Sequence, residues 1–134
     1  MANIKDIEGI GPAYGEKLEA AGIKTDYALL EQGASKKGRV EIAEKTGISE
    51  KLILEWVNRA DLARINGIGS EYADLLEASG VDSVPELAQR NAANLHAKMA
   101  EVNEEKSLVR ALPSETSVEK WVEEAKTLDR VVTH

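Results

Sequence analysis

The pentapeptide Ile7-Glu8-Gly9-Ile10-Gly11 is repeated 58 residues later as Ile65-Asn66-Gly67-Ile68-Gly69. Identities continue beyond it at the same spacing: Tyr14 with Tyr72, Leu18 with Leu76, Glu19 with Glu77, Ala20 with Ala78, Gly22 with Gly80, and Leu29 with Leu87. The chain is therefore a tandem repeat. Because short repeats cannot bury their apolar faces alone, we expect the two copies to stack and share a core.

A second pair of matching segments lies near the end of each copy, where Glu55-Trp56-Val57 resembles Lys120-Trp121-Val122. These segments are 65 residues apart, so the second copy carries about seven or eight extra residues, a difference read from the repeat spacing. We place the extra residues in the polar stretch 103–117. The predicted division is 1–60 for the first repeat and 61–134 for the second, and the sequence leaves open whether these form one domain or two.

Start and stop signals divide each copy into short helices. Pro12 suits a first helical turn, and Gly22 suits the stop that follows it. Ser83 and Glu86 have the spacing of a reciprocal capping box. The predicted N-caps are Thr25, Ser35 and Ser49 in the first copy and Ser83, Asn91 and Ser117 in the second. Since no stretch alternates with a period of two, we predict an all-α fold of two repeats, each followed by further short helices and packed as one compact helical body.

Composition limits the classes of function. The chain has 134 residues, with 24 acidic and 17 basic side chains, so its formal net charge is −7. The absence of cysteine excludes zinc fingers, iron-sulfur sites, thiol nucleophiles and disulfide scaffolds. No apolar run approaches the roughly 18 residues of a membrane span. The first residues lack the pattern of a secretory signal, so we expect a cytoplasmic protein.

Few residues suit catalysis or metal binding, and we predict a non-enzymatic protein with no metal site. His96 lacks a partner of metal-ligating type, and the other histidine is the terminal His134. Nothing places the glutamate pairs in a dry cleft. The run 11–15 lacks the Gly-Lys-Ser/Thr ending of a phosphate-binding Walker loop.

The Gly-Ile-Gly turns are the motif that carries chemistry. Glycine lets the backbone approach a partner closely, and it adopts positive φ at little cost. Each turn precedes a predicted helix, whose first amides and positive dipole end suit a phosphate oxygen. We expect Ile10 and Ile68 to point inward and anchor the turns.

Both segments resemble the helix-hairpin-helix motif. Its pattern is matched by Ile4, Ile7, Gly9-Ile10-Gly11 and Gly15, and again by Leu62, Ile65, Gly67-Ile68-Gly69 and Ala73. With the paired repeats and the tryptophan segments, the whole chain resembles an uncharacterised bacterial domain-of-unknown-function family with tandem helix-hairpin-helix motifs. That family carries no established activity. The resemblance to the parent helix-hairpin-helix motif of DNA repair and recombination proteins implies a hairpin that grips duplex backbone without reading bases, in some proteins through a bound monovalent cation. No other cofactor is implied.

Both copies depart from that pattern, and the second also carries a larger negative charge. Phosphate-gripping hairpins usually carry Lys or Arg just after the second glycine, where this chain has Pro12-Ala13 and Ser70-Glu71. Residues 1–60 hold 9 basic and 10 acidic side chains, whereas residues 61–134 hold 8 and 14. A negative field opposes nucleic-acid binding. The nucleic-acid contacts are therefore predicted in the first copy, at Gly9, Ile10, Gly11, Lys5, Lys17, Lys36, Lys37 and Arg39, while Gly67, Ile68 and Gly69 are predicted to be structural.

Two hypotheses for function stay open. The first is a module that binds nucleic-acid backbone through the first hairpin. The second is an acidic protein-interaction or accessory-subunit module, without nucleic-acid binding. Trp56 and Trp121 are predicted to be core residues rather than base-stacking platforms. The cluster 36–39 suits either a solvated helix start or a phosphate clamp, and the sequence leaves the oligomeric state open.

Overall fold

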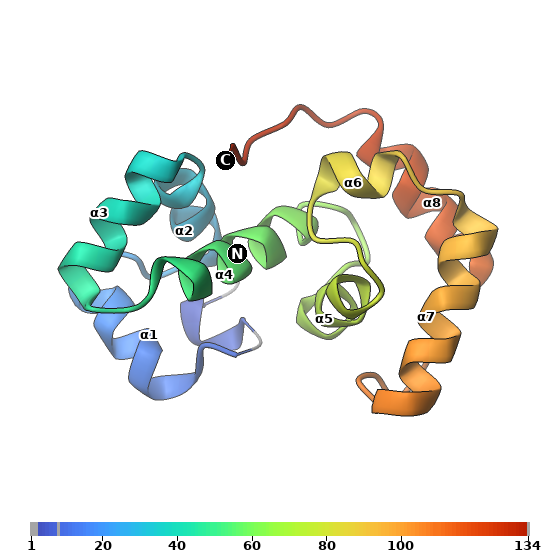
Figure 1. Cartoon of the computed structure of the whole chain (residues 1–134), viewed down its shortest axis with the longest axis horizontal. Coiled ribbons are helices and arrows are strands. Elements are labelled where there is room, and N and C mark those ends of the chain that lie inside the picture. The colour runs from blue at the N-terminus through green and yellow to red at the C-terminus, as the bar shows by residue number, and fades with distance from the viewer. Residues whose placement is uncertain (1–2, 8, 134) are drawn as a thin grey trace. The chain divides into compact units, whose positions relative to one another are not determined.

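The computed structural model describes residues 3–7 and 9–133, and over these residues it is helical, with no strand (Figure 1). Its elements are η1 (Ile4–Asp6), α1 (Gly11–Ala20), α2 (Asp26–Gly33), α3 (Lys36–Thr46), α4 (Glu50–Leu62), α5 (Ser70–Ala78), α6 (Val84–Ala88), α7 (Ala92–Lys106) and α8 (Glu115–Ala125). The all-α prediction is confirmed for this part of the chain. Within it, no helix combines the length and the apolar character needed to cross a bilayer.

The chain divides into two units. Unit 1 is Met1–Asp61 together with Val131–His134, and unit 2 is Leu62–Arg130. The repeat pattern predicts that residues 131–134 belong to the second repeat, but these residues are part of unit 1. Val132 is buried, and the N–H of Thr133 donates to the carbonyl of Ala34 over 2.7 Å. His134 lies outside the described residues. Unit 2 is thus an insertion between two segments of unit 1.

Each unit has its own aliphatic core. The unit 1 cluster is built around Leu18, Ile23, Leu29, Ile53, Trp56 and Val57, and the unit 2 cluster around Leu76, Val84, Leu87, Leu95, Val118 and Trp121. The buried side chains of the described residues therefore form two clusters rather than the shared core that the repeat predicted. Trp56 and Trp121 are 1% and 4% exposed, so their prediction as core residues is confirmed.

Local capping explains where most helices begin. The side chains of Thr25 and Ser35 each accept the N–H three residues ahead, and Ser49 accepts that of Leu52 over 3.2 Å. Asn91 caps α7 in the same way. Gly22 and Gly47 follow α1 and α3 with positive φ, as stops of this kind require.

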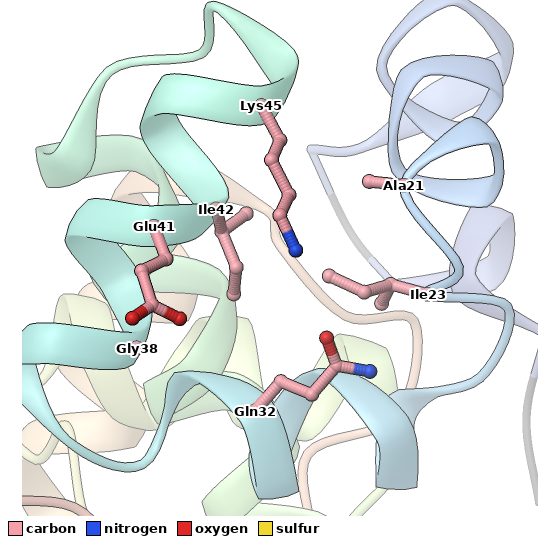
Figure 2. A pocket seen from close by; sticks show the side chains of 7 residues that line it. All are labelled: Ala21, Ile23, Gln32, Gly38, Glu41, Ile42 and Lys45. Atoms are coloured by element: carbon pink, nitrogen blue, oxygen red, sulfur yellow. The ribbon is translucent and has the colours of Figure 1, made fainter.

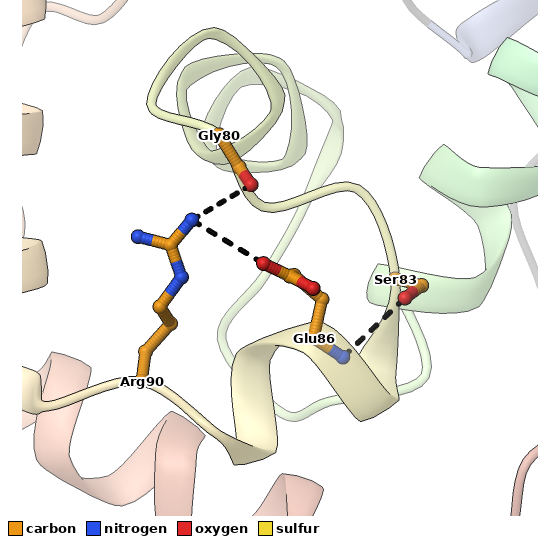
Figure 3. Close-up of polar contacts among 4 residues, drawn as sticks. All are labelled: Gly80, Ser83, Glu86 and Arg90. Atoms are coloured by element: carbon orange, nitrogen blue, oxygen red, sulfur yellow. Dashed lines mark hydrogen bonds and ion pairs between the residues drawn. The ribbon is translucent and has the colours of Figure 1, made fainter.

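Two predicted caps differ from the structure. The last helix starts earlier than expected, because Ser114 is its N-cap and Ser117, inside the helix, supplies the bonded N–H. At α6, Ser83 accepts the N–H of Glu86, but the carboxylate of Glu86 points to Arg90 (Figure 3). Arg90 also donates to the carbonyl of Gly80, so it bridges the end of α5 and α6 within unit 2.

The second copy has a longer α7, with 15 residues against 11 in α3, and a longer connection after it. Residues 47–49 join α3 to α4, whereas residues 107–114 join α7 to α8. The longer link is held by Asn103, whose side chain accepts the N–H of Val109 over 2.9 Å and donates to its carbonyl over 3.2 Å. The link lies within the stretch that the sequence analysis predicted.

Candidate functional site at the two glycine loops

We call residues 7–11 the first glycine loop and residues 65–69 the second. In both loops the central isoleucine is buried, with Ile10 at 3% exposure and Ile68 at 4%. Each isoleucine N–H donates to the carbonyl three residues earlier over 3.1 Å. The prediction that these side chains anchor the loops is confirmed.

The first glycine of each loop makes room for internal packing. Gly9 and Gly67 have φ values of 91° and 92°. A Cβ atom on Gly9 would lie 2.9 Å from Nη1 of Arg59 and 3.5 Å from Nε1 of Trp56, and one on Gly67 would lie 3.0 Å from Nε1 of Trp121. The requirement for glycine at these two positions is therefore structural.

A tyrosine-tryptophan pair supports each loop from behind. The rings of Tyr14 and Trp56 are 5.1 Å apart at an angle of 57°, and those of Tyr72 and Trp121 are 5.4 Å apart at 49°. Tilted aromatic pairs at this distance are favourable. The two units therefore hold their glycine loops with the same aromatic arrangement.

The second glycine of each loop faces open space. A Cβ atom on Gly11 or Gly69 would meet no atom within 4 Å. Gly11 has φ of 63°, whereas Gly69 has φ of −95° and an extended backbone. Gly11 is the first residue of α1 and Gly69 directly precedes α5, and neither helix has a side-chain cap at its start. The first-turn amides of a helix have no acceptor within the helix itself. Pro12 removes one such amide from α1.

The charge beside the loops has opposite sign in the two units. Arg59 follows Trp56 by three residues, and its guanidinium lies against Gly9. Glu124 follows Trp121 by the same three residues, and its two carboxylate oxygens each accept the N–H of Asn66 over 3.3 Å. A cation therefore neighbours the first glycine loop, and an anion already binds an amide of the second.

Of the two other lysines predicted as contacts near this loop, Lys5 lines the hollow around it and Lys17 does not. Lys5 crosses α1 where Gly15 leaves space for its side chain, and its Nζ is 3.4 Å from Oε1 of Glu19. The Lys5 side chain is 41% exposed, so this ion pair contributes little to stability. Lys17 on α1 is exposed. A shallow hollow lined by Lys5, Asp6, Ile7 and residues 9–14 surrounds the loop.

The basic cluster at the start of α3 does not join this site. Lys36 and Lys37 are exposed, but Figure 1 shows the start of α3 well away from the loop that precedes α1. Lys36 lines a different hollow, with Glu50, Lys51 and Leu54. The first glycine loop and the two lysines are thus separate parts of unit 1.

Arg39 must be withdrawn from the predicted phosphate contacts because its side chain is buried. The residue is 2% exposed, and its guanidinium donates to the carbonyls of Gly33, Ala34 and Thr133 over 2.9, 3.0 and 2.6 Å. Burial lowers the pKa of Arg39, and the Glu50 carboxylate partly opposes that change. An arginine remains charged at neutral pH even so.

Other features of unit 1 and unit 2 offer less chemistry. A hollow of about 190 Å³ lies among α2, α3 and the residues that follow α1. The side chains of Gln32 and Lys45 point into the space between Ile23 and Ile42 (Figure 2). In unit 2, Nε2 of His96 is 2.9 Å from the carbonyl of Pro113. Over the described residues, no three His, Asp or Glu side chains gather as metal ligands.

Comparison with known proteins identifies the family. A model of the family DUF4332, described as a domain of unknown function, matches residues 8–128. The chain belongs to this family. Searches among curated proteins and among solved structures give no significant match. The match covers residues 8–11 of the first glycine loop, the whole second glycine loop and both tryptophan helices of this DUF4332 chain.

Sequence reasoning missed the two residues that distinguish the loops. Arg59 and Glu124 carry opposite charge at equivalent places in the repeat. Each lies three residues after a core tryptophan and therefore on the same face of its helix. Aligning the two tryptophan segments could have identified Arg59 and Glu124. The helix face that carries the buried tryptophan is also the face that meets the loop, and both residues lie on it.

Proposed function

We propose that this DUF4332 protein is a non-enzymatic helix-hairpin-helix module that binds the phosphate backbone of nucleic acid through the first glycine loop. The observation that carries the proposal is the guanidinium of Arg59 beside Gly9, in the same loop as Gly11, where a Cβ atom would meet nothing within 4 Å. Amides at a helix start bind phosphate oxygens well when a cation stands close by. Lys5, which lines the hollow around this loop, adds positive charge there.

The second glycine loop is not part of the proposed site. Glu124 supplies an internal carboxylate to the N–H of Asn66, and Glu71 is exposed in the first turn of α5. A phosphate approaching this loop meets two like charges. The proposal therefore assigns one contact point to each chain, with weak affinity and no base readout.

The proposal is tested by titrating the protein into a labelled DNA duplex and, separately, a labelled single strand. Fluorescence anisotropy measures the affinity at about 20 and 200 mM salt. Neutralising about three phosphates predicts a loss of affinity of several hundred-fold over that tenfold range in salt. Arg59→Gln and Lys5→Glu should each weaken binding about tenfold or more at the lower salt. Lys45→Glu, on α3, is the matched control and should change it less than threefold.

The same titration gives the results that contradict the proposal. Binding that resists salt, or that falls equally in the Lys45→Glu control, would remove the first glycine loop from the interaction. Circular dichroism of each variant checks that the helices are intact. Absence of binding to either nucleic acid at low salt rejects the proposal outright.

A protein-interaction role is the second candidate, and the charge of the second repeat favours it. Residues 61–134 hold 14 acidic side chains against 8 basic ones. Glu115, Glu119 and Glu123 lie exposed along α8 at intervals of four, so they share one face. A basic protein partner should then bind more weakly when all three become glutamine, whereas Arg59→Gln should leave that binding unchanged.

A further inference from the structure

We infer that unit 1 contains a peptide-binding site and that residues 131–133 occupy it as an exchangeable ligand. The ligand class is a non-helical peptide segment with a buried β-branched side chain, followed by a residue whose N–H and C=O are both bound. This inference concerns Arg39 and the end of α2, so it is independent of the function proposed for the first glycine loop.

The contacts at the end of α2 are those of main-chain recognition. The carbonyl of Ala34 accepts the N–H of Thr133 over 2.7 Å, and Nη2 of Arg39 donates to the carbonyl of Thr133 over 2.6 Å. Both polar groups of that peptide residue are thereby satisfied. Val132, one residue earlier, is 3% exposed within the unit 1 cluster, and Val131 packs against the same cluster.

Comparison with unit 2 indicates that the packing of α3 does not itself require an arginine at position 39. Arg39 lies four residues after Ser35, the N-cap of α3, and Leu95 lies four residues after Asn91, the N-cap of α7. Leu95 is 1% exposed, so an apolar side chain serves the core at this helical position in unit 2. Unit 1 buries a cation there instead, which is costly unless acceptors surround it.

The acceptors of Arg39 come from two sources. Its Nη1 atom donates to the carbonyls of Gly33 and Ala34, which end α2 and have no helical partner. Its Nη2 atom reaches the segment that has returned from unit 2 (Figure 1). The arginine thus stays fixed on α2 whether or not the segment is bound, and the segment completes its set of acceptors.

The contacts that hold the segment are few. In the described residues they are the Thr133 N–H and C=O bonds, one long Thr133 hydroxyl contact of 3.4 Å to Ala34, the burial of Val132 and the partial packing of Val131. Each ordered residue loses backbone entropy, which offsets much of that gain. We therefore expect the segment to detach while the rest of unit 1 stays folded, as local opening does in other proteins.

Amide hydrogen exchange in the intact chain tests this. The Thr133 amide should exchange at least tenfold more slowly than in an unstructured peptide and at least tenfold faster than the core amide of Ile53. Arg39→Leu should speed Thr133 exchange at least tenfold, while Lys36→Leu, the matched control, leaves it unchanged. Exchange of Thr133 at the unstructured rate, or only together with Ile53 by global unfolding, overturns the inference.

Binding in trans gives a second test. A chain ending at Arg130 should bind a labelled peptide of residues 128–134, and the same peptide with Val132→Asp should bind at least tenfold more weakly. The intact chain should also bind it at least tenfold more weakly, because its own segment competes. If the truncated chain folds but does not bind the peptide, the inference is overturned. If the truncated chain does not fold, the hydrogen-exchange rates of the intact chain decide the question.

Discussion

The two glycine loops share a backbone scaffold and differ in what stands beside it. In both, a glycine at positive φ packs on a tryptophan that pairs with a tyrosine. The residue three places after the tryptophan is Arg59 in one unit and Glu124 in the other. The repeat therefore preserves the support of the loop and reverses the sign of the neighbouring charge.

The largest expected effect comes from removing the tryptophan that packs against each glycine loop. Trp56→Ala and Trp121→Ala each remove a buried indole from a loop, so each should cost about 3–5 kcal/mol of folding stability. Denaturant unfolding followed by circular dichroism measures both. Losses of similar size support equivalent roles, and a variant that costs less than about 1 kcal/mol would show that its loop does not depend on the indole.

Reversing the charge at the second loop tests the difference. Glu124→Lys should raise nucleic-acid affinity about tenfold at low salt, because it replaces the anion at Asn66 with a cation. Glu124→Gln, which removes the charge and keeps an acceptor, should give a smaller rise. Anisotropy titrations compare the two variants, and unchanged affinity in Glu124→Lys would mean that charge does not exclude this loop.

Gly11 and Gly69 both face open space, but only Gly11 has a positive φ. Substitutions at the two positions therefore test the effect of backbone conformation. Gly11→Ala should cost about 1 kcal/mol, because φ of 63° strains a residue with a Cβ atom. Gly69→Ser should change stability by less than about 0.5 kcal/mol, since φ is −95° and serine caps helices well. Thermal unfolding measures both, and an equal loss in the two variants would contradict the difference between the loops.

The smallest effect concerns the ion pair at the first loop. Glu19→Gln should alter stability by less than about 0.5 kcal/mol, because the Lys5 pair is exposed. It should nevertheless strengthen nucleic-acid binding about twofold to threefold by removing a competing anion, as counterion effects predict. Glu44→Gln, also exposed but on α3, is the control, and equal gains in both variants would point to net charge alone.

Local chemistry explains what could be predicted from sequence. Thr25, Ser35 and Asn91 act through hydrogen bonds to residues three positions away, so a short window of sequence contains each start signal. The inward isoleucines and the buried tryptophans follow from apolar spacing on a helix. The fold class and the presence of two glycine loops depended on these local patterns.

Long-range contacts explain what could not be predicted. The Lys36–Arg39 run reads as one basic cluster, but Arg39 turns inward to meet carbonyls at Gly33 and, 94 residues away, at Thr133. No local pattern predicts that residues 131–133 return to unit 1. The charge beside each loop was encoded in the repeat at Arg59 and Glu124, yet its position became clear only from the packing of α4 and α8.

The return of the chain to unit 1 has a mechanical consequence. Because residues 3 and 133 both belong to unit 1, a pulling force applied at those two points enters and leaves through that unit. The Thr133 bonds to Ala34 and Arg39 lie in the direct line of tension, and unit 2 carries none of it until they break. Under load the chain should extend first by peeling its last residues from α2, with unit 2 shielded until that contact has failed.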